Sequence, residues 1–234
     1  MNLIPAFQTI TSNGSNTVGA EVLSRWHHQG QVYGPADHKT PINWGLVDLE
    51  IMKSLIHLVP VIERLYPSIF INVSPQTLSF SDIRMKWFKL LKELTDKAPF
   101  QVVIEITEKV TPEQLDNAWP LLSQFNVAFA MDDFGEDHSS VSRLTSYSWQ
   151  FCKVEIGQLK GLAGNAAVQY CRLNNITPIA ERVESVAQSE VAKLLGLEWQ
   201  QGFLHGKPIT FDLEVNSLVK QVQVSEPVRV GVMS

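Results

Sequence analysis

The feature that most constrains the fold is a regular alternation of short apolar runs with longer amphipathic stretches. The apolar runs, rich in β-branched residues, lie at 18–23, 69–74, 101–107, 127–133, 151–156 and 176–183. Runs that are apolar on both faces and separated by helix-length segments are typical of parallel strands covered by helices. The alternation therefore predicts an α/β fold.

The stretches between these runs predict helices at 45–65, 82–96, 112–125, 160–174 and 185–196. Thr111 followed by Pro112 is suited to begin a helix, since threonine caps the first turn and proline fits its first position. Gly196 is suited to end the last predicted helix. We find no sequence repeat of 20–50 residues, so what recurs is the order of strand and helix and not the sequence itself.

The length of 234 residues and the 44% hydrophobic content suffice for one large core. Barrels of this size commonly form a single domain. We expect one domain over residues 1–210. The remaining residues, 211–234, form a tail that completes or flanks the barrel and could add a last helix and an extended segment.

The net charge of −5 provides no basic surface for a long nucleic acid, so we expect no such partner. An acidic protein can still bind a phosphate ligand where metal ions supply positive charge. The two cysteines, Cys152 and Cys171, form no CxxC pair and fit a reducing compartment. The N-terminus lacks a signal-like apolar segment, and no apolar run is long enough to span a membrane. We therefore expect a cytoplasmic protein with no membrane segment in this chain.

Polar residues lie at the end of each apolar run, a buried position where they do not favour stability. They are Glu21, Asn72, Glu105, Asp132, Asp133, Lys153, Glu181 and Glu184. A single carboxylate there could cap the next helix or face solvent. In a (β/α) barrel, however, the carboxyl ends of all strands meet at one face, where active sites are built. Because six consecutive runs end this way, we expect these side chains to converge.

A cluster of carboxylates needs compensating cations, because like charges at close range cannot all stay ionised. Oxygen ligands of this kind suit Mg²⁺ or Mn²⁺. Adjacent carboxylates such as Asp132 and Asp133 can serve two ions in phosphodiester cleavage. Lys153 would place a further cation at this centre, either to orient a water or to counter charge in the transition state.

The ordered motifs resemble those of the EAL-domain phosphodiesterases of bacterial cyclic di-GMP signalling. The resemblance begins at 7–10, FQTI for the family's YQPI, and ends at 201–208, QGFLHGKP for QGYLFGKP. Between them lie Glu21-Val22-Leu23 with Arg25-Trp26, Asn72-Val73-Ser74, Glu105-Ile106-Thr107-Glu108, Asp132-Asp133-Phe134-Gly135, Lys153-Val154-Glu155 and Glu181-Arg182-Val183-Glu184.

The resemblance implies a TIM-like (β/α) barrel with one antiparallel strand, which the segment around 3–10 could supply. It implies hydrolysis of cyclic di-GMP to linear 5′-pGpG with two Mg²⁺ or Mn²⁺ ions. One ion would be bound by Glu21, Asn72, Glu105 and Asp132, and the second ion or its water by Asp133 and Glu181. The resemblance further implies that Lys153 holds the nucleophilic water and that Glu184 and Gln201 support the site and this water. It implies a loop anchor at Glu108. The residues that it implies to contact the substrate are Gln8, Glu21, Leu23 and Arg25.

The chain departs from the family pattern at several positions around this site. In the family loop DFGTGYSS, Thr and the second Gly are replaced here by Glu136 and Asp137. Glu155 replaces the aspartate that follows the lysine, and Arg182 replaces the glycine of EGVE. Arg182 could reach a phosphate or obstruct one. The acidic loop predicts a slow enzyme that needs more metal than a typical relative.

Two functions remain open at the level of sequence. The retained acidic, amide and lysine positions favour an active phosphodiesterase. The altered loop favours the alternative, a catalytically weak or silent EAL module that binds cyclic di-GMP or a protein partner as a regulator. The resemblance also implies a homodimer built through the segment after Asp133 and the helix near 160–174, and two-fold association is common among soluble proteins.

Overall fold

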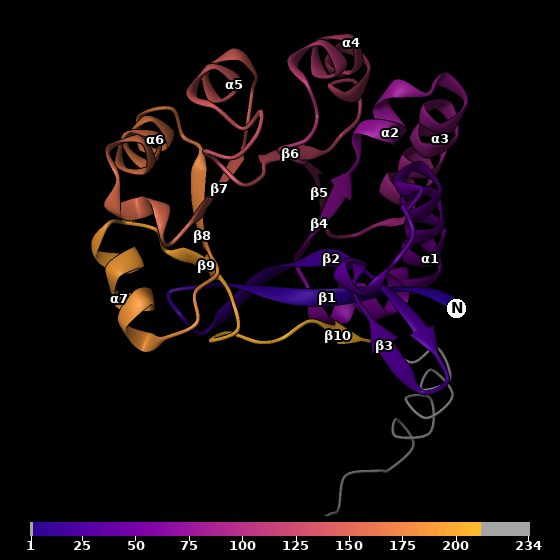
Figure 1. Cartoon of the computed structure of the whole chain (residues 1–234), viewed down its shortest axis with the longest axis horizontal. Coiled ribbons are helices and arrows are strands. Elements are labelled where there is room, and N and C mark those ends of the chain that lie inside the picture. Colours follow the sequence, from indigo (N-terminus) through magenta and orange to yellow (C-terminus); the bar gives the residue numbers. More distant parts are fainter. Residues whose placement is uncertain (1, 212–234) are drawn as a thin grey trace, which may run out of the picture.

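The computed structural model describes residues 2–211, which form a ring of strands surrounded by helices (Figure 1). The strands are β1 (Asn2–Ser12), β2 (Asn16–His28), β3 (Gln31–Tyr33), β4 (Ser68–Val73), β5 (Gln101–Ile106), β6 (Ala128–Met131), β7 (Phe151–Glu155), β8 (Thr177–Glu181), β9 (Trp199–Gln201) and β10 (Ile209–Thr210). The helices are α1 (Trp44–Leu65), α2 (Pro75–Ser79), α3 (Ser81–Lys97), α4 (Pro112–Leu122), α5 (Val141–Ser146), α6 (Leu162–Leu173) and α7 (Val186–Leu194), with short 3-10 helices η1 (Pro35–Asp37) and η2 (Gln158–Lys160).

Eight strands close the barrel in the order β1-β9-β8-β7-β6-β5-β4-β2, and β2 pairs back onto β1. The barrel strands β2 and β4 through β9 pair in parallel, whereas β1 is antiparallel to both of its barrel neighbours. A tight turn joins β1 to β2, with positive φ at Asn13 and Gly14, and such a short connection can join only antiparallel strands. The predicted TIM-like barrel with one antiparallel strand is confirmed.

The predicted helices are present with small shifts in their ends. The helix predicted to end at residue 125 ends at Leu122, and the one predicted from 160 begins at Leu162 after a 3-10 turn. Thr111 caps α4 in a reciprocal pair of hydrogen bonds with Gln114, and Gly196 follows α7 with φ +77°. The sequence pattern missed α2, α5, β3, β9 and β10. The missed strands have three residues or fewer and the missed helices six or fewer, too few for a strand or helical period to be recognised.

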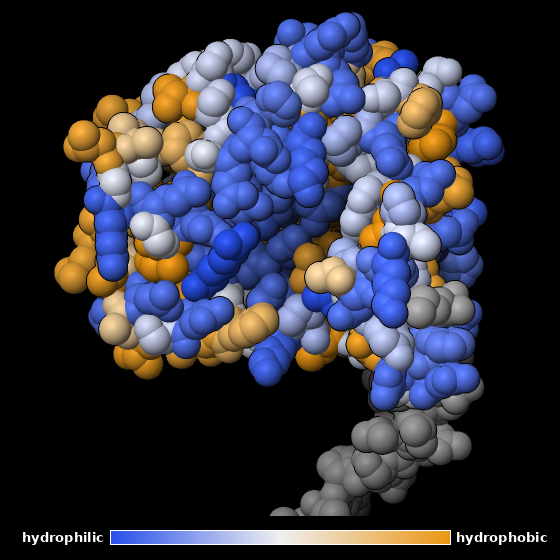
Figure 2. Space-filling view, viewed as in Figure 1, coloured by the Kyte–Doolittle hydropathy of each residue, from blue (hydrophilic) through white to orange (hydrophobic). Residues whose placement is uncertain are grey.

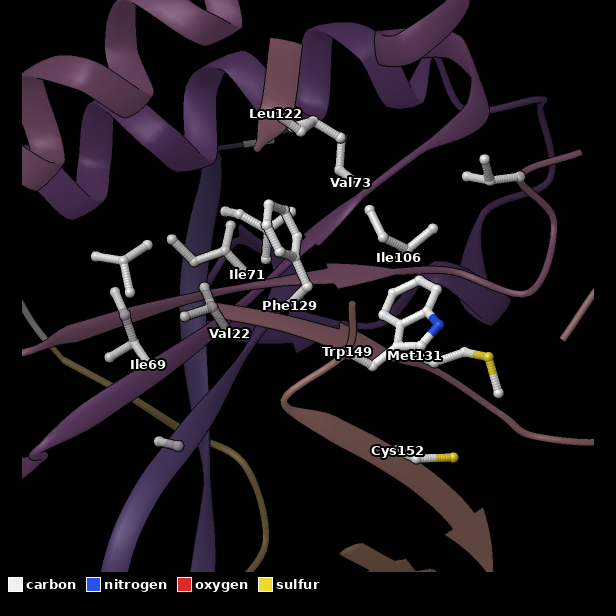
Figure 3. Packing of buried hydrophobic residues seen from close by; sticks show 14 of the residues in the cluster. Val22, Ile69, Ile71, Val73, Ile106, Leu122, Phe129, Met131, Trp149 and Cys152 are labelled. Carbon is white, nitrogen blue, oxygen red and sulfur yellow. The ribbon is translucent and has the colours of Figure 1, made fainter. Parts of the chain in front are cut away.

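The larger part of the hydrophobic core lies between the strands and the surrounding helices (Figure 3). There Val73 of β4 and Met131 of β6 pack in the same buried cluster as Leu122 of α4. A second, smaller cluster fills the interior of the barrel: Ile10, Phe70, Val103, Ala128, Ala130, Phe151 and Ile179. Two of its rings, Phe70 and Phe151, meet edge to face with centroids 5.0 Å apart. The barrel interior is thus filled below the level of the polar strand ends.

None of the helices within residues 2–211 is long and apolar enough to cross a membrane. The helix and extended segment expected in the tail fall mainly on 212–234, outside the described residues.

Candidate active site

A layer of polar side chains lies directly above the apolar layer of the barrel interior. Side chains alternate between the two faces of a strand, so residue i+2 points into the same interior as residue i. Phe70 is followed in this way by Asn72, Val103 by Glu105, Ala130 by Asp132, Phe151 by Lys153 and Ile179 by Glu181. The antiparallel β1 runs the other way, so its Gln8 precedes Ile10. Strand alternation therefore gathers these polar side chains into one layer, whereas Asp133 and Glu184 lie beyond the strand ends.

Lys153 occupies the centre of the polar layer with 1% of its surface exposed. Its ammonium Nζ lies 2.8 Å from Glu181 Oε1, 3.2 Å from Glu21 Oε2 and 3.2 Å from Asp132 Oδ1. It also pairs with Oε1 of Glu105, which is fully buried. One buried cation on β7 thus contacts acidic groups from β2, β5, β8 and the end of β6.

Amide side chains hold the carboxylate of Glu21 in place. Asn72 Nδ2 donates to Glu21 Oε1 at 2.9 Å, and Gln201 Nε2 donates to Glu21 Oε2 at 2.6 Å. Gln201 Nε2 also lies 3.2 Å from Gln8 Oε1, and Gln8 Nε2 donates to the Gly206 carbonyl at 3.2 Å. Hydrogen bonds of this kind fix the orientation of a ligand carboxylate.

The site contains more negative than positive charge. Burial, together with the neighbouring carboxylates, raises the pKa of Glu105 and of Glu181 well above the usual range, although Lys153 opposes this. Burial lowers the pKa of Lys153, but Asp132, Glu105, Glu181 and Glu21 together raise it well above its ordinary value. Lys153 therefore stays protonated, and because one ammonium cannot balance four acidic groups, Glu105 and Glu181 tend to keep their protons when no cation is bound.

The arrangement fits divalent cations. Within residues 2–211, the buried oxygens Glu105 Oε2 and Glu181 Oε2 have no hydrogen-bond partner. Glu108, Asp132 and Asp133 bring carboxylate oxygens within 4.8 Å of one another. Glu108 was predicted from the resemblance as a loop anchor, and its closeness to the two aspartates was missed. Oxygen donors in excess of the local positive charge suit Mg²⁺ or Mn²⁺.

Asp133 differs from its neighbours because it lies just beyond the strand end, with φ +41°. Burial and the adjacent charge of Asp132 raise its pKa to about 7, with smaller contributions in the same direction from Glu108 and Glu136. The next residue, Phe134, donates its backbone N–H to the Lys153 carbonyl at 3.0 Å. This bond ties the start of the following loop to β7.

The loop after Asp133 is held by backbone hydrogen bonds within the loop and to Glu108. Gly135 donates its N–H to the Ser139 carbonyl at 2.7 Å, and His138 donates to the Glu108 carbonyl at 3.0 Å. Glu108 therefore contacts the loop through its backbone while its side chain faces the aspartates. Asp137, which replaces the glycine of the related motif, has φ +38°, in the region that favours glycine.

The polar layer opens into a cavity of about 330 Å³. Figure 2 shows hydrophilic side chains gathered around a hollow over the barrel. The cavity is lined by Gln8, Glu21, Asp132, Asp133, Lys153, Glu181, Arg182, Glu184, Gln201, Gly202 and Phe203. Glu184 is exposed, and Phe203 leaves 56% of its surface exposed. The cavity therefore combines an acidic floor with an aromatic side chain and a guanidinium.

A second, mainly apolar pocket of about 270 Å³ shares Glu21 with the polar cavity. Leu23 and Arg25 line this pocket, as does Trp44 at the start of α1. Sequence reasoning missed Asp48, which also lines it. Asp48 Oδ2 accepts hydrogen bonds from the backbone N–H and the hydroxyl of Ser74, at 2.9 and 2.7 Å. The only feature of the sequence that could have indicated Asp48 is that it places a carboxylate on the otherwise apolar face of the predicted helix 45–65.

Together, the fold and the site define a (β/α) barrel protein with a cluster of acidic and amide oxygen donors at the carboxyl ends of its strands. A family model described as "EAL domain" matches residues 1–208. The chain therefore belongs to the EAL domain family.

Individual relatives agree with this assignment. The chain is 27% identical over 212 residues to the protein named cyclic di-GMP phosphodiesterase PdeL of Escherichia coli, covering 82% of this chain and 58% of that protein. The chain spans about half the length of the curated relatives it matches.

Two solved structures share the fold. The Bacillus subtilis YkuI protein, in complex with cyclic di-GMP and calcium, is similar with a TM-score of 0.73 and 24% identity, over 94% of this chain and 59% of that one. The Klebsiella pneumoniae BlrP1 complex with manganese and cyclic di-GMP is similar with a TM-score of 0.72 and 22% identity, over 90% and 56%.

Proposed function

We propose that this chain hydrolyses cyclic di-GMP to linear 5′-pGpG in a reaction that depends on Mg²⁺ or Mn²⁺. The observation that carries the proposal is the buried Lys153 among four carboxylates, two of which, Glu105 and Glu181, keep an oxygen without a hydrogen-bond partner within residues 2–211. Membership of a family whose curated relatives are named cyclic di-GMP phosphodiesterases supports the substrate.

The residues that would hold the ions follow from the donor set. We assign Glu21, Asn72, Glu105 and Asp132 to one ion, and Asp133 with Glu181 to a second ion or its water. Glu108 is close enough to Asp132 and Asp133 to contribute to the second position. Divalent ions bound there would lower the pKa of a water and withdraw charge from a phosphoryl group.

The other polar residues would position the water and the phosphate. Lys153 keeps its proton, so its ammonium can donate a hydrogen bond to a water or to a phosphoryl oxygen above the site. Gln201 Oε1 is buried without a hydrogen-bond partner among the described residues, so it can accept one from a water. We assign Glu184, exposed at the cavity wall, as a further support of the catalytic site.

The two adjoining cavities suit the two parts of a nucleotide. The apolar pocket beside Leu23, Arg25 and Trp44 can take a flat base, while the polar cavity takes the phosphate. Gln8 lines the polar cavity and Glu21 lines both, so both can contact the substrate where base and phosphate meet. The residues proposed to contact the substrate are therefore Gln8, Glu21, Leu23 and Arg25.

A regulatory module that binds cyclic di-GMP without efficient turnover is the second candidate function. The acidic loop favours it, because Glu136 raises the pKa of Asp133 and Asp137 adopts a backbone conformation suited to glycine. Metal binding at Asp133 would be weakened by both effects.

The two functions are separated by incubating the protein with cyclic di-GMP and Mn²⁺, resolving the products by chromatography and measuring binding by calorimetry. Formation of pGpG that stops on addition of EDTA supports the enzyme. Binding without pGpG supports the regulatory module. Absence of both binding and turnover contradicts both.

We also propose a cytoplasmic location and a homodimer. Cys152 and Cys171 are buried free thiols, a state that persists in a reducing compartment. The dimer would involve α6, which exposes 92% of Leu162 and 83% of Leu173. These leucines are the first and last residues of α6, and a contact along this helix would remove their apolar surface from water.

A further inference from the structure

Arg182, at the end of β8, has a backbone conformation that an arginine adopts only at a cost. Its φ is +55°, in the left-handed region that favours glycine. The conformation is imposed from both sides, because the Glu181 carbonyl accepts from Ile156 at 3.0 Å and the Val183 N–H donates to the Gln201 carbonyl at 3.1 Å. A non-glycine residue held in this way indicates a role for its side chain.

Stability does not account for that side chain. The guanidinium of Arg182 forms an ion pair with Glu155 at the end of β7, but 64% of the Arg182 side chain remains exposed. Ion pairs this exposed contribute little to folding. The pair instead holds the guanidinium in a defined position, since 17% of the Glu155 side chain is exposed and its strand is fixed in the barrel.

The position of Arg182 is at the acidic cavity that would hold the phosphate. Arg182 lines this cavity together with Asp133, Glu181 and Phe203. Its charge is favoured there, because the attraction of Glu155, Asp133, Glu136 and Glu181 outweighs burial and raises its pKa. A guanidinium has a planar fork of donors that matches the oxygens of a phosphate, with more than one N–H available at a time.

We infer that Arg182 is a substrate-binding residue that donates hydrogen bonds to a phosphate oxygen of the phosphodiester. Glu155 keeps the guanidinium in position beside the cavity before the substrate enters. The inference rests on the proposed hydrolysis of cyclic di-GMP and deepens it. Because a contact with a phosphate exists before and after the bond is cleaved, Arg182 contributes mainly to binding and much less to turnover.

The test compares four variants. Arg182→Gly removes the guanidinium and suits the left-handed backbone, so this variant folds at least as well as the wild type. Arg182→Lys keeps the charge but not the fork. Glu155→Gln with Arg182→Gly removes both partners and shows whether a freed Glu155 carboxylate repels the substrate. Arg64→Ala removes an exposed arginine from the last turn of α1, at the opposite end of the barrel.

Four quantities are measured: KM and kcat for cyclic di-GMP, the Kd of pGpG in the presence of Mn²⁺, and the thermal midpoint. Arg182→Gly should raise both KM and Kd by about tenfold or more, as expected for loss of a charge-assisted hydrogen bond, and change kcat by less than about threefold. The double variant should match it. The KM and Kd of Arg182→Lys should fall between those of the wild type and Arg182→Gly. The KM and Kd of Arg64→Ala should equal those of the wild type.

The outcomes separate this inference from the proposed function. If the wild type forms pGpG and Arg182→Gly has an unchanged or lower KM and Kd, Arg182 does not bind the phosphate and the inference is wrong, while the function stands. Recovery of affinity in the double variant would also overturn it, because the effect would then come from Glu155. A wild-type protein that neither binds nor cleaves cyclic di-GMP removes the proposed function and this inference with it.

Discussion

The ammonium of Lys153 lies 2.8 Å from Oε1 of Glu181, so the middle of β7 and the end of β8 are joined by a buried ion pair at the centre of the polar layer. The same ammonium contacts carboxylates from three further segments of the barrel. Lys153 therefore has two functions. It stabilises an acidic cluster in the barrel interior, and it places a proton donor where the phosphate is proposed to bind.

Replacing Lys153 with methionine should affect stability and turnover together. Loss of the ammonium leaves buried carboxylates without a partner, so the free energy of unfolding in EDTA should fall by about 3–5 kcal/mol. Mn²⁺ should restore part of this stability, and kcat should fall more than substrate affinity. Urea unfolding with and without Mn²⁺ measures the first effect and steady-state kinetics the second. The exposed Lys92, paired with Asp96, provides a control whose methionine variant should behave as the wild type. Lys153→Met with unchanged kcat would disprove the catalytic role.

The pKa of Asp133 predicts a pH dependence of metal binding. Burial and Asp132 raise this pKa to about 7, so below that pH a divalent ion must displace a proton. Loss of this proton should increase the affinity for Mn²⁺ as the pH rises through about 7. Asp133→Asn should weaken binding and flatten the dependence. Titration of Mn²⁺ at several pH values is the measurement, and identical pH profiles for the two proteins would refute the assignment.

The same raised pKa affects the metal-free protein. In unfolded chains an aspartate has a pKa of about 3.9, so between that value and about 7 only the folded state keeps the proton. The contribution of Asp133 to stability should therefore fall as the pH rises through this window and stay constant above it. Asp133→Asn should reduce this fall in denaturant unfolding carried out in EDTA.

The acidic loop predicts a weak second metal position. Replacing Glu136 with threonine and Asp137 with glycine removes a charge that raises the pKa of Asp133 and relieves a left-handed aspartate. The double variant should reach half-maximal activity at a lower Mn²⁺ concentration. Activity as a function of Mn²⁺ tests this, and coincident curves would show that the loop substitutions are neutral.

The proposed dimer predicts that a charge on α6 separates the subunits. Leu162→Glu and Leu173→Glu should each shift the sedimentation coefficient from that of a dimer to that of a monomer. Leu194 on α7 is similarly exposed at 86%, and Leu194→Glu is the matched control that should leave the dimer intact. A wild-type protein that is monomeric at tens of micromolar would contradict the dimer.

The polar layer could be predicted from sequence because charged residues are rare inside apolar strands. Glu105 and Lys153 each interrupt such a run, and strand geometry requires them to point into the barrel. Asp48 could not be recognised in this way, because an acid near the start of a helix is common on exposed surfaces. Its hydrogen bonds to Ser74 depend on the packing of α1 against the end of β4.

The pairing of Arg182 with Glu155 was likewise hidden. The two residues are far apart in the sequence, and their contact follows from the parallel register in which Glu155 of β7 lies opposite Glu181 of β8. Sequence alone showed that both positions departed from the family pattern. Only the three-dimensional arrangement of β7 and β8 shows that the two replacements form an ion pair with each other.

The most direct test of the central claim is the initial rate of pGpG formation from cyclic di-GMP with Mn²⁺, compared between the wild type and Glu105→Gln. Glu105 is fully buried, and glutamine keeps its shape while removing the charge proposed to bind metal. The wild type should form pGpG at a rate abolished by EDTA, and Glu105→Gln should lose about hundredfold or more of that rate and most of the Mn²⁺-induced thermal stabilisation. Equal rates for the two proteins, or a wild-type rate unaffected by EDTA, would contradict a metal-dependent phosphodiesterase at this site.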